Sequence, residues 1–106
     1  MFIYNVTTHV ESSIEKQWLD WMHEEHIPQM IKTGKFTKAL LLKVKTEDDD
    51  DDLGGSSYAT QFQCVDQSSF EAYLKEDVGI LRKSAQEKFG EKILSFRTEL
   101  ELISTF

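Results

Sequence analysis

The most constraining feature of this sequence is the order of its segments with strand-like and helix-like spacing of hydrophobic residues. Alternation typical of strands runs over residues 2–10, 36–46, 58–65 and 94–102. Apolar residues at helical spacing run over 14–26 and again over 68–89. Alternation of apolar and polar residues indicates a half-buried strand, and spacing of three or four indicates an amphipathic helix. The predicted order is therefore strand, helix, strand, strand, helix, strand.

This order predicts an α+β fold of one particular kind. It is the ferredoxin-like βαββαβ arrangement, a four-stranded antiparallel sheet with two main helices on one face. The chain has 106 residues, which is room for a single domain over 1–106 and not for two. Within that domain, the run Asp48–Asp52 and the pair Gly54-Gly55 predict a flexible acidic loop over 47–57.

Alternation also divides the strand residues between the two faces of the sheet. The more apolar set is assigned to the side that meets the helices, and it includes Phe2, Tyr4, Val6, Leu40, Leu42, Tyr58, Phe62, Leu94, Phe96 and Leu100. The opposite set is polar with few charges, and it includes Asn5, Thr7, Gln61, Gln63, Ser95 and Arg97. Protein interfaces deplete charge at their centre but keep hydrogen-bonding groups, so this second face is predicted to pair with another copy. Plain exposure to solvent is the alternative, as antiparallel sheets allow.

The charge distribution argues against nucleic-acid and membrane partners. The formal net charge is −7, and five acidic residues are adjacent at 48–52. The basic residues are scattered, whereas a phosphate backbone or an anionic membrane requires them to be clustered. No apolar run approaches the roughly 20 residues of a membrane helix, and the first residues do not resemble a signal peptide. The single cysteine, Cys64, suits a reducing compartment, so we expect a cytoplasmic protein.

The end of the first predicted helix carries a motif. The segment 18–28, WLDWMHEEHIP, resembles the aromatic-x-x-Glu-His-x-Pro run of EthD-like proteins in the dimeric α/β-barrel superfamily. With the turn at 33–36, the segment 88–90 and the closing strand, the whole chain resembles an uncharacterised family of that superfamily, a domain of unknown function. The resemblance implies a ferredoxin-like fold that pairs into a dimeric α/β barrel. It does not select an activity, because the superfamily includes cofactor-independent monooxygenases, isomerases, haem-degrading enzymes and proteins with no known activity.

His26 is the candidate catalytic residue. It follows the aromatic face of the helix and precedes Pro28, at the mouth of the cleft expected between sheet and helices. A neutral imidazole can serve there as a general base near neutral pH. The alternative is a structural role, in which the imidazole bonds a backbone carbonyl and fixes the end of the helix.

Five further residues are candidates for ligand binding, in a pocket expected to be on the order of a few hundred Å³. They are Tyr4, Trp18, Trp21, His23 and Tyr58. Core packing is the alternative for the two tryptophans. No metal is predicted, because His23 and His26 lack the third protein ligand that a catalytic zinc site requires. No cofactor is predicted either: haem-degrading members use a histidine on the second helix, and 68–89 contains none.

Three hypotheses about function follow, and the sequence does not decide whether the protein is an enzyme. In the first, a protein of unknown function binds a small molecule in the sheet–helix cleft near His26. In the second, a cofactor-independent monooxygenase-like or isomerase-like enzyme uses His26. In the third, a non-catalytic dimeric interaction module has a filled core and an exposed apolar patch. The expected partners are a second copy of the chain and a small molecule.

Overall fold

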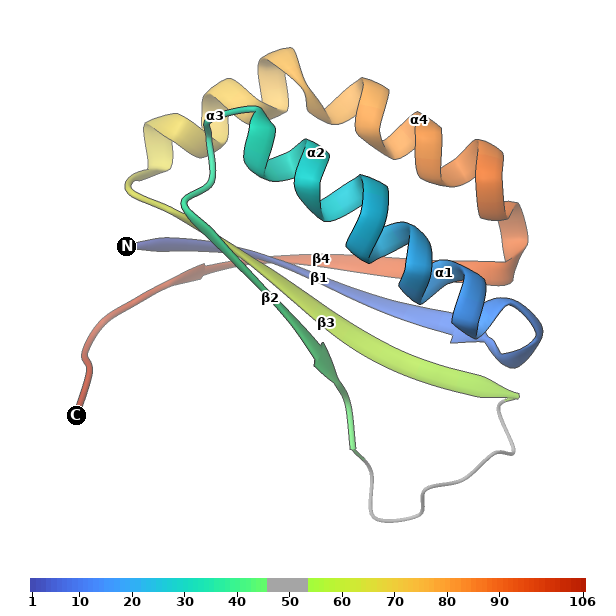
Figure 1. Ribbon diagram of the computed structural model, residues 1–106. Helices are drawn as coiled ribbons and strands as arrows, with labels where there is room; N and C mark the ends of the chain where they lie inside the picture. Colours follow the sequence, from blue (N-terminus) through green and yellow to red (C-terminus); the bar gives the residue numbers. More distant parts are fainter. Residues whose placement is uncertain (46–53) are drawn as a thin grey trace.

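Four antiparallel strands form one sheet, and all the helices lie on the same side of it (Figure 1). The computed structural model describes residues 1–45 and 54–106. The strands are β1 (Phe2–Glu11), β2 (Lys38–Lys43), β3 (Gly55–Cys64) and β4 (Ile93–Glu101). Their order in the sheet is β2-β3-β1-β4, so the two long central strands are flanked by β2 and β4. The predicted α+β, ferredoxin-like order of elements is confirmed.

The predicted acidic loop over 47–57 is only partly within the described residues. The run Asp48–Asp52 lies outside them. Residues 55–57 belong to β3, where Gly55 pairs with Glu11 and Ser57 pairs with His9. The strand therefore begins earlier than alternation predicted, because the Gly-Ser-Ser start of β3 carries no apolar side chains that would reveal it.

The first helical segment contains a change of helix type. α1 (Glu15–Trp21) continues through a π-helical turn (Met22–His26) into α2 (Ile27–Lys32). The N–H of Ile27 donates to the carbonyl of Met22, five residues back. Proline within a helix usually interrupts it, since proline lacks an N–H and its ring crowds the carbonyl four residues before it. The wider π turn directly before the proline accommodates the ring while the chain stays helical.

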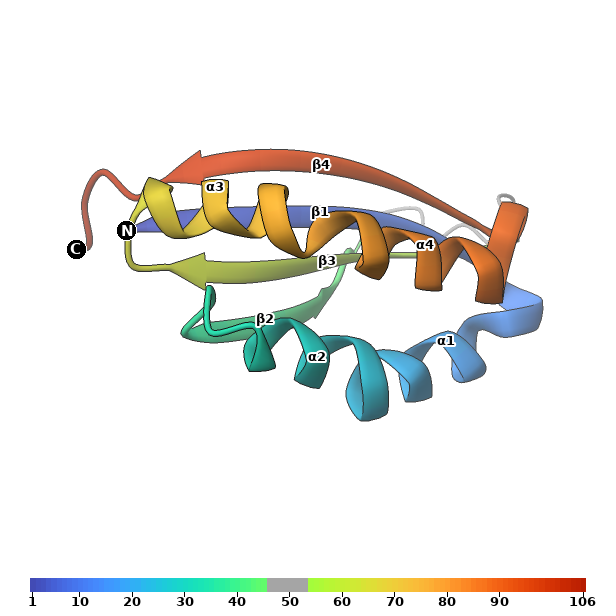
Figure 2. The same ribbon diagram turned by 90° about the horizontal axis from the view of Figure 1, so that it is seen from above.

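The second helical segment is divided in two. α3 (Gln67–Glu76) and α4 (Val78–Phe89) are separated at Asp77. Asp66 caps α3 by accepting a hydrogen bond from the N–H of Ser69 at 2.9 Å, as N-cap residues do. Seen from above, β4 lies outside the outline of α3 and α4 (Figure 2). One edge of the sheet is therefore less covered by helices than the rest.

The face assignment made from alternation is correct for the central strands. Tyr4, Tyr58 and Phe62 lie on the helix-facing side and are at most 5% exposed. Directly paired residues in an antiparallel sheet point to the same side. Tyr4 pairs with Phe62, which is consistent with both side chains entering the same core.

In the edge strands the face assignment is wrong. Arg97 pairs with Val6 and Ser95 pairs with Thr8, so these polar residues of β4 point toward the helices. Leu94 and Phe96 point away from the helices and are 59% and 61% exposed. The apolar residues of β2 that were assigned to the helix side, Leu40 and Leu42, face away in the same manner. We call the side of the sheet away from the helices the open face; its exposed apolar side chains include Leu42, Leu94, Phe96 and Leu100.

The core between sheet and helices consists of two clusters rich in aromatic residues. One gathers around Tyr4, Phe36, Phe62, Phe70 and Tyr73. The other gathers around Val10, Trp18, Trp21, Tyr58 and Phe89. Residues of both clusters contribute to the cavity described below.

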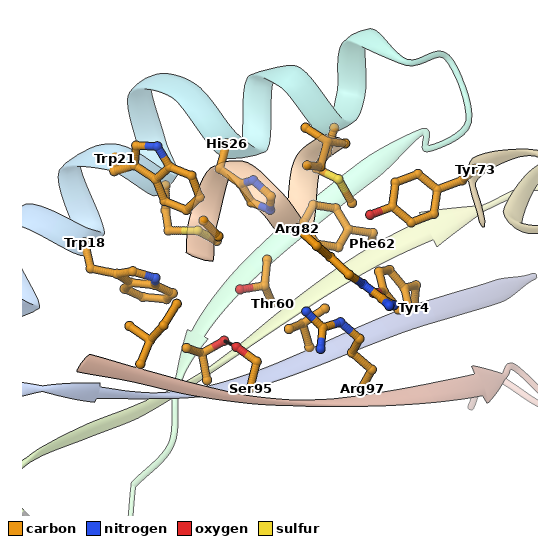
Figure 3. A pocket seen from close by; sticks show the side chains of 17 residues that line it. Tyr4, Trp18, Trp21, His26, Thr60, Phe62, Tyr73, Arg82, Ser95 and Arg97 are labelled. Carbon is orange, nitrogen blue, oxygen red and sulfur yellow. Dashed lines mark hydrogen bonds between the residues drawn. The ribbon is translucent and has the colours of Figure 1, made fainter. Parts of the chain in front are cut away.

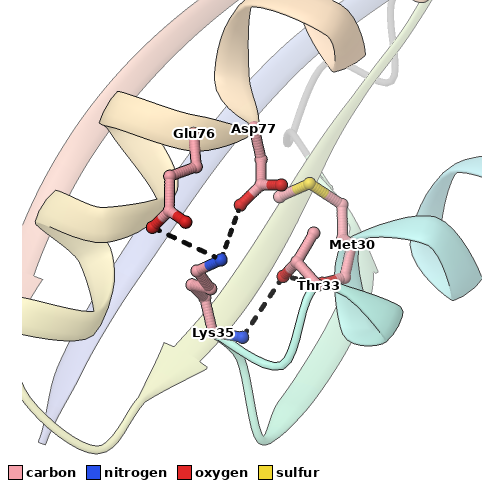
Figure 4. A network of polar contacts seen from close by, with 5 residues as sticks. All are labelled: Met30, Thr33, Lys35, Glu76 and Asp77. Carbon is pink, nitrogen blue, oxygen red and sulfur yellow. Dashed lines mark hydrogen bonds and ion pairs between the residues drawn. The ribbon is translucent and has the colours of Figure 1, made fainter.

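Lys35 joins the loop after α2 to the junction of α3 and α4 (Figure 4). Its ammonium lies 3.1 Å from the Asp77 carboxylate and 3.7 Å from that of Glu76. Its backbone N–H donates to the Thr33 hydroxyl at 3.2 Å, and that hydroxyl donates to the Met30 carbonyl at 2.7 Å. The side chain of Lys35 is only 19% exposed, so this network is better shielded from water than a typical surface ion pair.

Within 1–45 and 54–106, none of the helices has both the length and the apolar character needed to cross a bilayer.

Candidate functional site

A cavity of about 60 Å³ lies between the helix-facing side of the sheet and the helices (Figure 3). Its volume is smaller than the few hundred Å³ expected from the sequence and admits only part of a drug-sized ligand. Every layer of the fold contributes to its wall, with β1, β3 and β4 below and α1, the π turn, α2, α3 and α4 above. The cavity is therefore a product of the complete fold, as the predicted sheet–helix cleft requires.

One part of the cavity wall is apolar. It is formed by Trp18, Trp21, Met22, Met30, Phe62 and Leu81. All of these side chains are at most 8% exposed, and their neighbours in the core hold them in place. This part of the wall offers a ligand apolar and aromatic surface.

A second part of the wall carries guanidinium and phenol groups. Arg82 of α4 and Arg97 of β4 turn toward the same space, beside Tyr4 (Figure 3). The Arg82 Nη2 donates to the Tyr4 hydroxyl at 3.3 Å. Burial, strengthened by nearby Tyr4, raises the pKa of Tyr73 above its usual range although the two arginines oppose the shift. The Tyr73 phenol therefore stays protonated at neutral pH and can donate a hydrogen bond.

Three hydroxyl groups complete the polar part of the wall. Thr8 and Thr60 are 4% and 1% exposed. The Thr8 Oγ1 lies 3.0 Å from the Ser95 Oγ, across the β1–β4 pair. Each hydroxyl can both donate and accept, so these groups can satisfy a ligand atom of either kind.

His26, at the end of the π turn, lies across the cavity from Arg97 (Figure 3). Its ring stacks on Trp21 with centroids 4.7 Å apart and meets the edge of Phe62 at 6.4 Å. Burial, with a further contribution from the positive charge of Arg97, lowers the pKa of His26 to about 4. The imidazole is therefore neutral at pH 7. Its Nδ1 is buried and has no hydrogen-bond partner among the described residues.

The structure brings four of the six predicted site residues together. Tyr4, Trp18, Trp21 and His26 all line the cavity. His23 does not: it is exposed, and its Nδ1 lies 2.8 Å from the Leu19 carbonyl. Because both residues lie in the π turn, the side chains of His23 and His26 point in different directions.

Tyr58 also lies away from the cavity wall. Its ring packs against Trp18 at 5.1 Å, and its hydroxyl donates to the Glu15 carboxylate. Burial and the bond to Glu15 raise the pKa of Tyr58 to about 12. This side chain supports the position of Trp18 beneath α1.

Sequence reasoning missed Arg82, Arg97, Tyr73 and Ser95. Arg97 and Ser95 were assigned to the wrong side of the sheet, and Arg82 and Tyr73 lie on helices where no motif marks them. One signal was present: the chain contains only two arginines among its twelve basic residues, and both line this cavity. Among the described residues, no three His, Cys, Asp or Glu side chains converge as a metal ion requires.

The comparison with protein families identifies the chain. A family model described as a domain of unknown function, DUF4286, matches residues 1–103. This chain belongs to the DUF4286 family. The match spans the whole DUF4286 fold described above, from β1 to the residues after β4, and confirms the resemblance to an uncharacterised family. No curated protein is similar in sequence to this DUF4286 chain.

Solved structures share the fold of this DUF4286 protein. A dimeric ferredoxin-like protein from an uncultured marine organism aligns with a TM-score of 0.72 and 13% identity, covering 99% of this chain and 97% of that one. A second such protein aligns with a TM-score of 0.69 and 12% identity, covering 100% and 98%. An EthD-family protein from Bacillus halodurans C-125 aligns with a TM-score of 0.69 and 12% identity, covering 97% and 100%. At these identities the likeness shows the ferredoxin-like fold and no activity.

Proposed function

We propose that this protein binds a small organic molecule in the sheet–helix cavity beside His26, and that it does so as a homodimer. The observation that carries the proposal is the buried Nδ1 of His26, which has no partner among the described residues. Buried polar atoms are nearly always hydrogen-bonded in native proteins. The cavity already holds aromatic surface and convergent hydroxyl and guanidinium groups, so a ligand atom placed there supplies the missing partner.

The state of His26 favours binding over general-base catalysis. A general base works best when its pKa is close to the operating pH. The pKa of His26 is about 4, so its imidazole is neutral but only weakly basic at pH 7. Its contribution is then a fixed hydrogen bond to the ligand rather than a proton abstraction. This makes the monooxygenase-like or isomerase-like use of His26 the less favoured function.

A screen of small organic molecules tests the binding function, and the protein contains its own reporter. Its only two tryptophans, Trp18 and Trp21, both line the cavity. A ligand bound there should change tryptophan fluorescence and raise the melting temperature, since binding at about 100 times Kd stabilises by about 2.7 kcal/mol. Both effects should be lost in His26→Ala and kept in the matched control His23→Ala. If every molecule that stabilises the wild type stabilises His26→Ala equally, the site is not at His26.

The homodimer is supported by the open face of the sheet. Leu94, Phe96 and Leu100 lie along β4 on this face and are 37% to 61% exposed, and Leu42 is exposed on the same face at the opposite edge of the sheet. Monomeric soluble proteins rarely expose large contiguous apolar patches. Two of the similar structures are described as dimeric ferredoxin-like proteins. Pairing of two open faces would bury these side chains and leave the cavity, on the other side of the sheet, available to a ligand.

Light scattering coupled to size-exclusion chromatography tests the dimer. The wild type should elute with the mass of two chains. Phe96→Asp places a charge among the exposed apolar side chains of the open face and should yield monomers. Ile80→Asp is the matched control, because Ile80 is 75% exposed on α4, on the helix side of the molecule, and it should stay dimeric. A wild type of monomer mass at every concentration would reject the dimer.

A further inference from the structure

We propose that the ligand of this cavity is a small apolar carboxylic acid, and that Arg82 and Arg97 together bind its carboxylate. This inference rests on the proposed function and names the chemistry of the ligand. It is argued from the placement of the two arginines, their lack of partners, and the character of the surface opposite them.

The two arginines meet although they come from distant parts of the chain. Arg82 lies within α4 and Arg97 lies within β4. Seen from above, β4 runs along one side of α3 and α4 (Figure 2), and most of its residues are exposed. Both guanidinium groups turn from these elements into the cavity (Figure 3). They therefore combine access from solvent with contact to the interior of the site.

Neither arginine forms an ion pair with an acidic side chain among the described residues. In that part of the chain, every ion pair is formed by a lysine: Lys16, Lys35 or Lys83. The Tyr4 hydroxyl accepts a hydrogen bond from Arg82. Even Glu99, on the same side of β4 as Arg97, forms no ion pair with it.

This lack of partners is not explained by a shortage of acidic residues. The chain has 19 aspartates and glutamates against 12 lysines and arginines. Both arginines are exposed, and two like charges that share one site repel one another. An anion between the two groups removes this cost. The chain uses arginine only at these two positions, and arginine is the residue whose planar fork matches a carboxylate in a two-pronged contact.

A carboxylate fits this site better than a phosphate group does. Phosphate sites commonly use backbone N–H groups at helix N-termini or glycine-rich turns. Arg82 lies inside a helix and Arg97 inside a strand, and neither lies at a helix N-terminus or in a glycine-rich turn. The anion-binding donors here are side chains, which are the two guanidinium forks and the phenol groups of Tyr4 and Tyr73.

The rest of the ligand is expected to be apolar and small. From the arginines, the cavity leads toward the apolar side chains of Trp21 and Phe62 and to the neutral His26 (Figure 3). A cavity of about 60 Å³ holds only a few heavy atoms beyond the carboxylate. Short aliphatic chains suit this wall, whereas a second charge would meet no partner among the described residues there.

Butyrate is a suitable probe, compared with butyramide, butylamine and butyl phosphate at constant ionic strength. Tryptophan fluorescence and isothermal titration should show binding of butyrate, with butyramide and butylamine at least about tenfold weaker. Arg97→Gln and Arg82→Gln should each weaken butyrate binding by at least about tenfold, in line with a charge-assisted contact. Lys83→Gln, at the exposed position next to Arg82, is the matched control and should leave binding unchanged.

Several results would overturn the carboxylate assignment. They are no binding of butyrate, tighter binding of butyramide, butylamine or butyl phosphate, or an equal loss in Lys83→Gln. If neutral molecules bind in a manner that depends on His26 while butyrate does not, this inference fails and the proposed function stands. If nothing changes the tryptophan signal, both fail. Far-ultraviolet circular dichroism of each variant confirms that a loss of binding is not a loss of fold.

Discussion

The pH dependence of stability offers a direct test of how His26 is buried. Its pKa is about 4 in the folded protein against 6.5 for a free imidazole. The unfolded chain therefore binds a proton at a higher pH than the folded protein does. The neutral, buried imidazole therefore makes its full contribution to the free energy of unfolding above pH 6.5. That contribution is lost as the pH falls toward 4. Between about pH 7.5 and pH 5 the loss should be about 2 kcal/mol, because each unit of pH below 6.5 costs about 1.4 kcal/mol.

The perturbation that isolates this effect is His26→Phe. The substitution removes the titrating group and keeps an aromatic ring against Trp21. Urea denaturation at one fixed protein concentration gives the free energy of unfolding of wild type and variant at both pH values. Whatever His26→Phe does at about pH 7.5, its stability relative to wild type should improve by about 2 kcal/mol at pH 5. His23→Gln, which removes an exposed imidazole from the same helical segment, should retain the dependence due to His26.

Two outcomes would refute the reasoning. The first is a free energy of unfolding that falls equally with pH in wild type and His26→Phe. The second is an NMR titration in which His26 gains its proton near pH 6.5. Either result would mean that the imidazole is hydrated or paired with an acidic group in the folded protein, and the argument from an unpartnered buried nitrogen would fail with it.

Three further predictions concern the core and the surface. Phe62→Ala, at a fully buried position, should lower the free energy of unfolding by about 3–5 kcal/mol, and a loss below about 1 kcal/mol in denaturation experiments would show a loosely packed core. Burial raises the pKa of Cys64 to about 11, so an aromatic disulfide reagent should label the thiol quickly in urea and very slowly in the folded protein; equal rates would contradict the burial. Lys35→Met should lower the free energy of unfolding by leaving Asp77 unpaired, and high salt should reduce the difference from the wild type.

The fold could be predicted because its evidence is local. Each strand and helix shows its own period, and the order of periods selects the ferredoxin-like arrangement. The sides of the edge strands could not be predicted in the same way. Alternation separates Leu94 and Phe96 from Ser95 and Arg97, but both sets occur on one strand and either can face the helices. Assigning the apolar set to the helix side is correct when the opposite side of the strand is polar and faces water. It fails in β4, whose apolar side chains lie on the open face and whose polar side chains point toward the helices.

The candidate site was predictable only in part for the same reason. Tyr4, Trp21 and His26 belong to patterns that are visible along the chain. Arg82 and Arg97 are ordinary charged residues in their own segments, and only the register of β4 against β1 and the placement of α4 make them neighbours. His23 was chosen from regular helical spacing, and the π turn changes the relation between positions on either side of it.

The π turn at Met22–His26 also bears on how this helix can change its length. A π turn contains one residue more than an α-helical turn and confines the extra residue to a single place. A chain that is one residue shorter between Trp21 and Pro28 can therefore return to a regular α-helix, while α1 and α2 keep their contacts with the sheet. Such a deletion would re-aim the imidazole of His26 and spare the core. Loss of this one residue is thus a route by which the cavity could acquire a new ligand without a new fold.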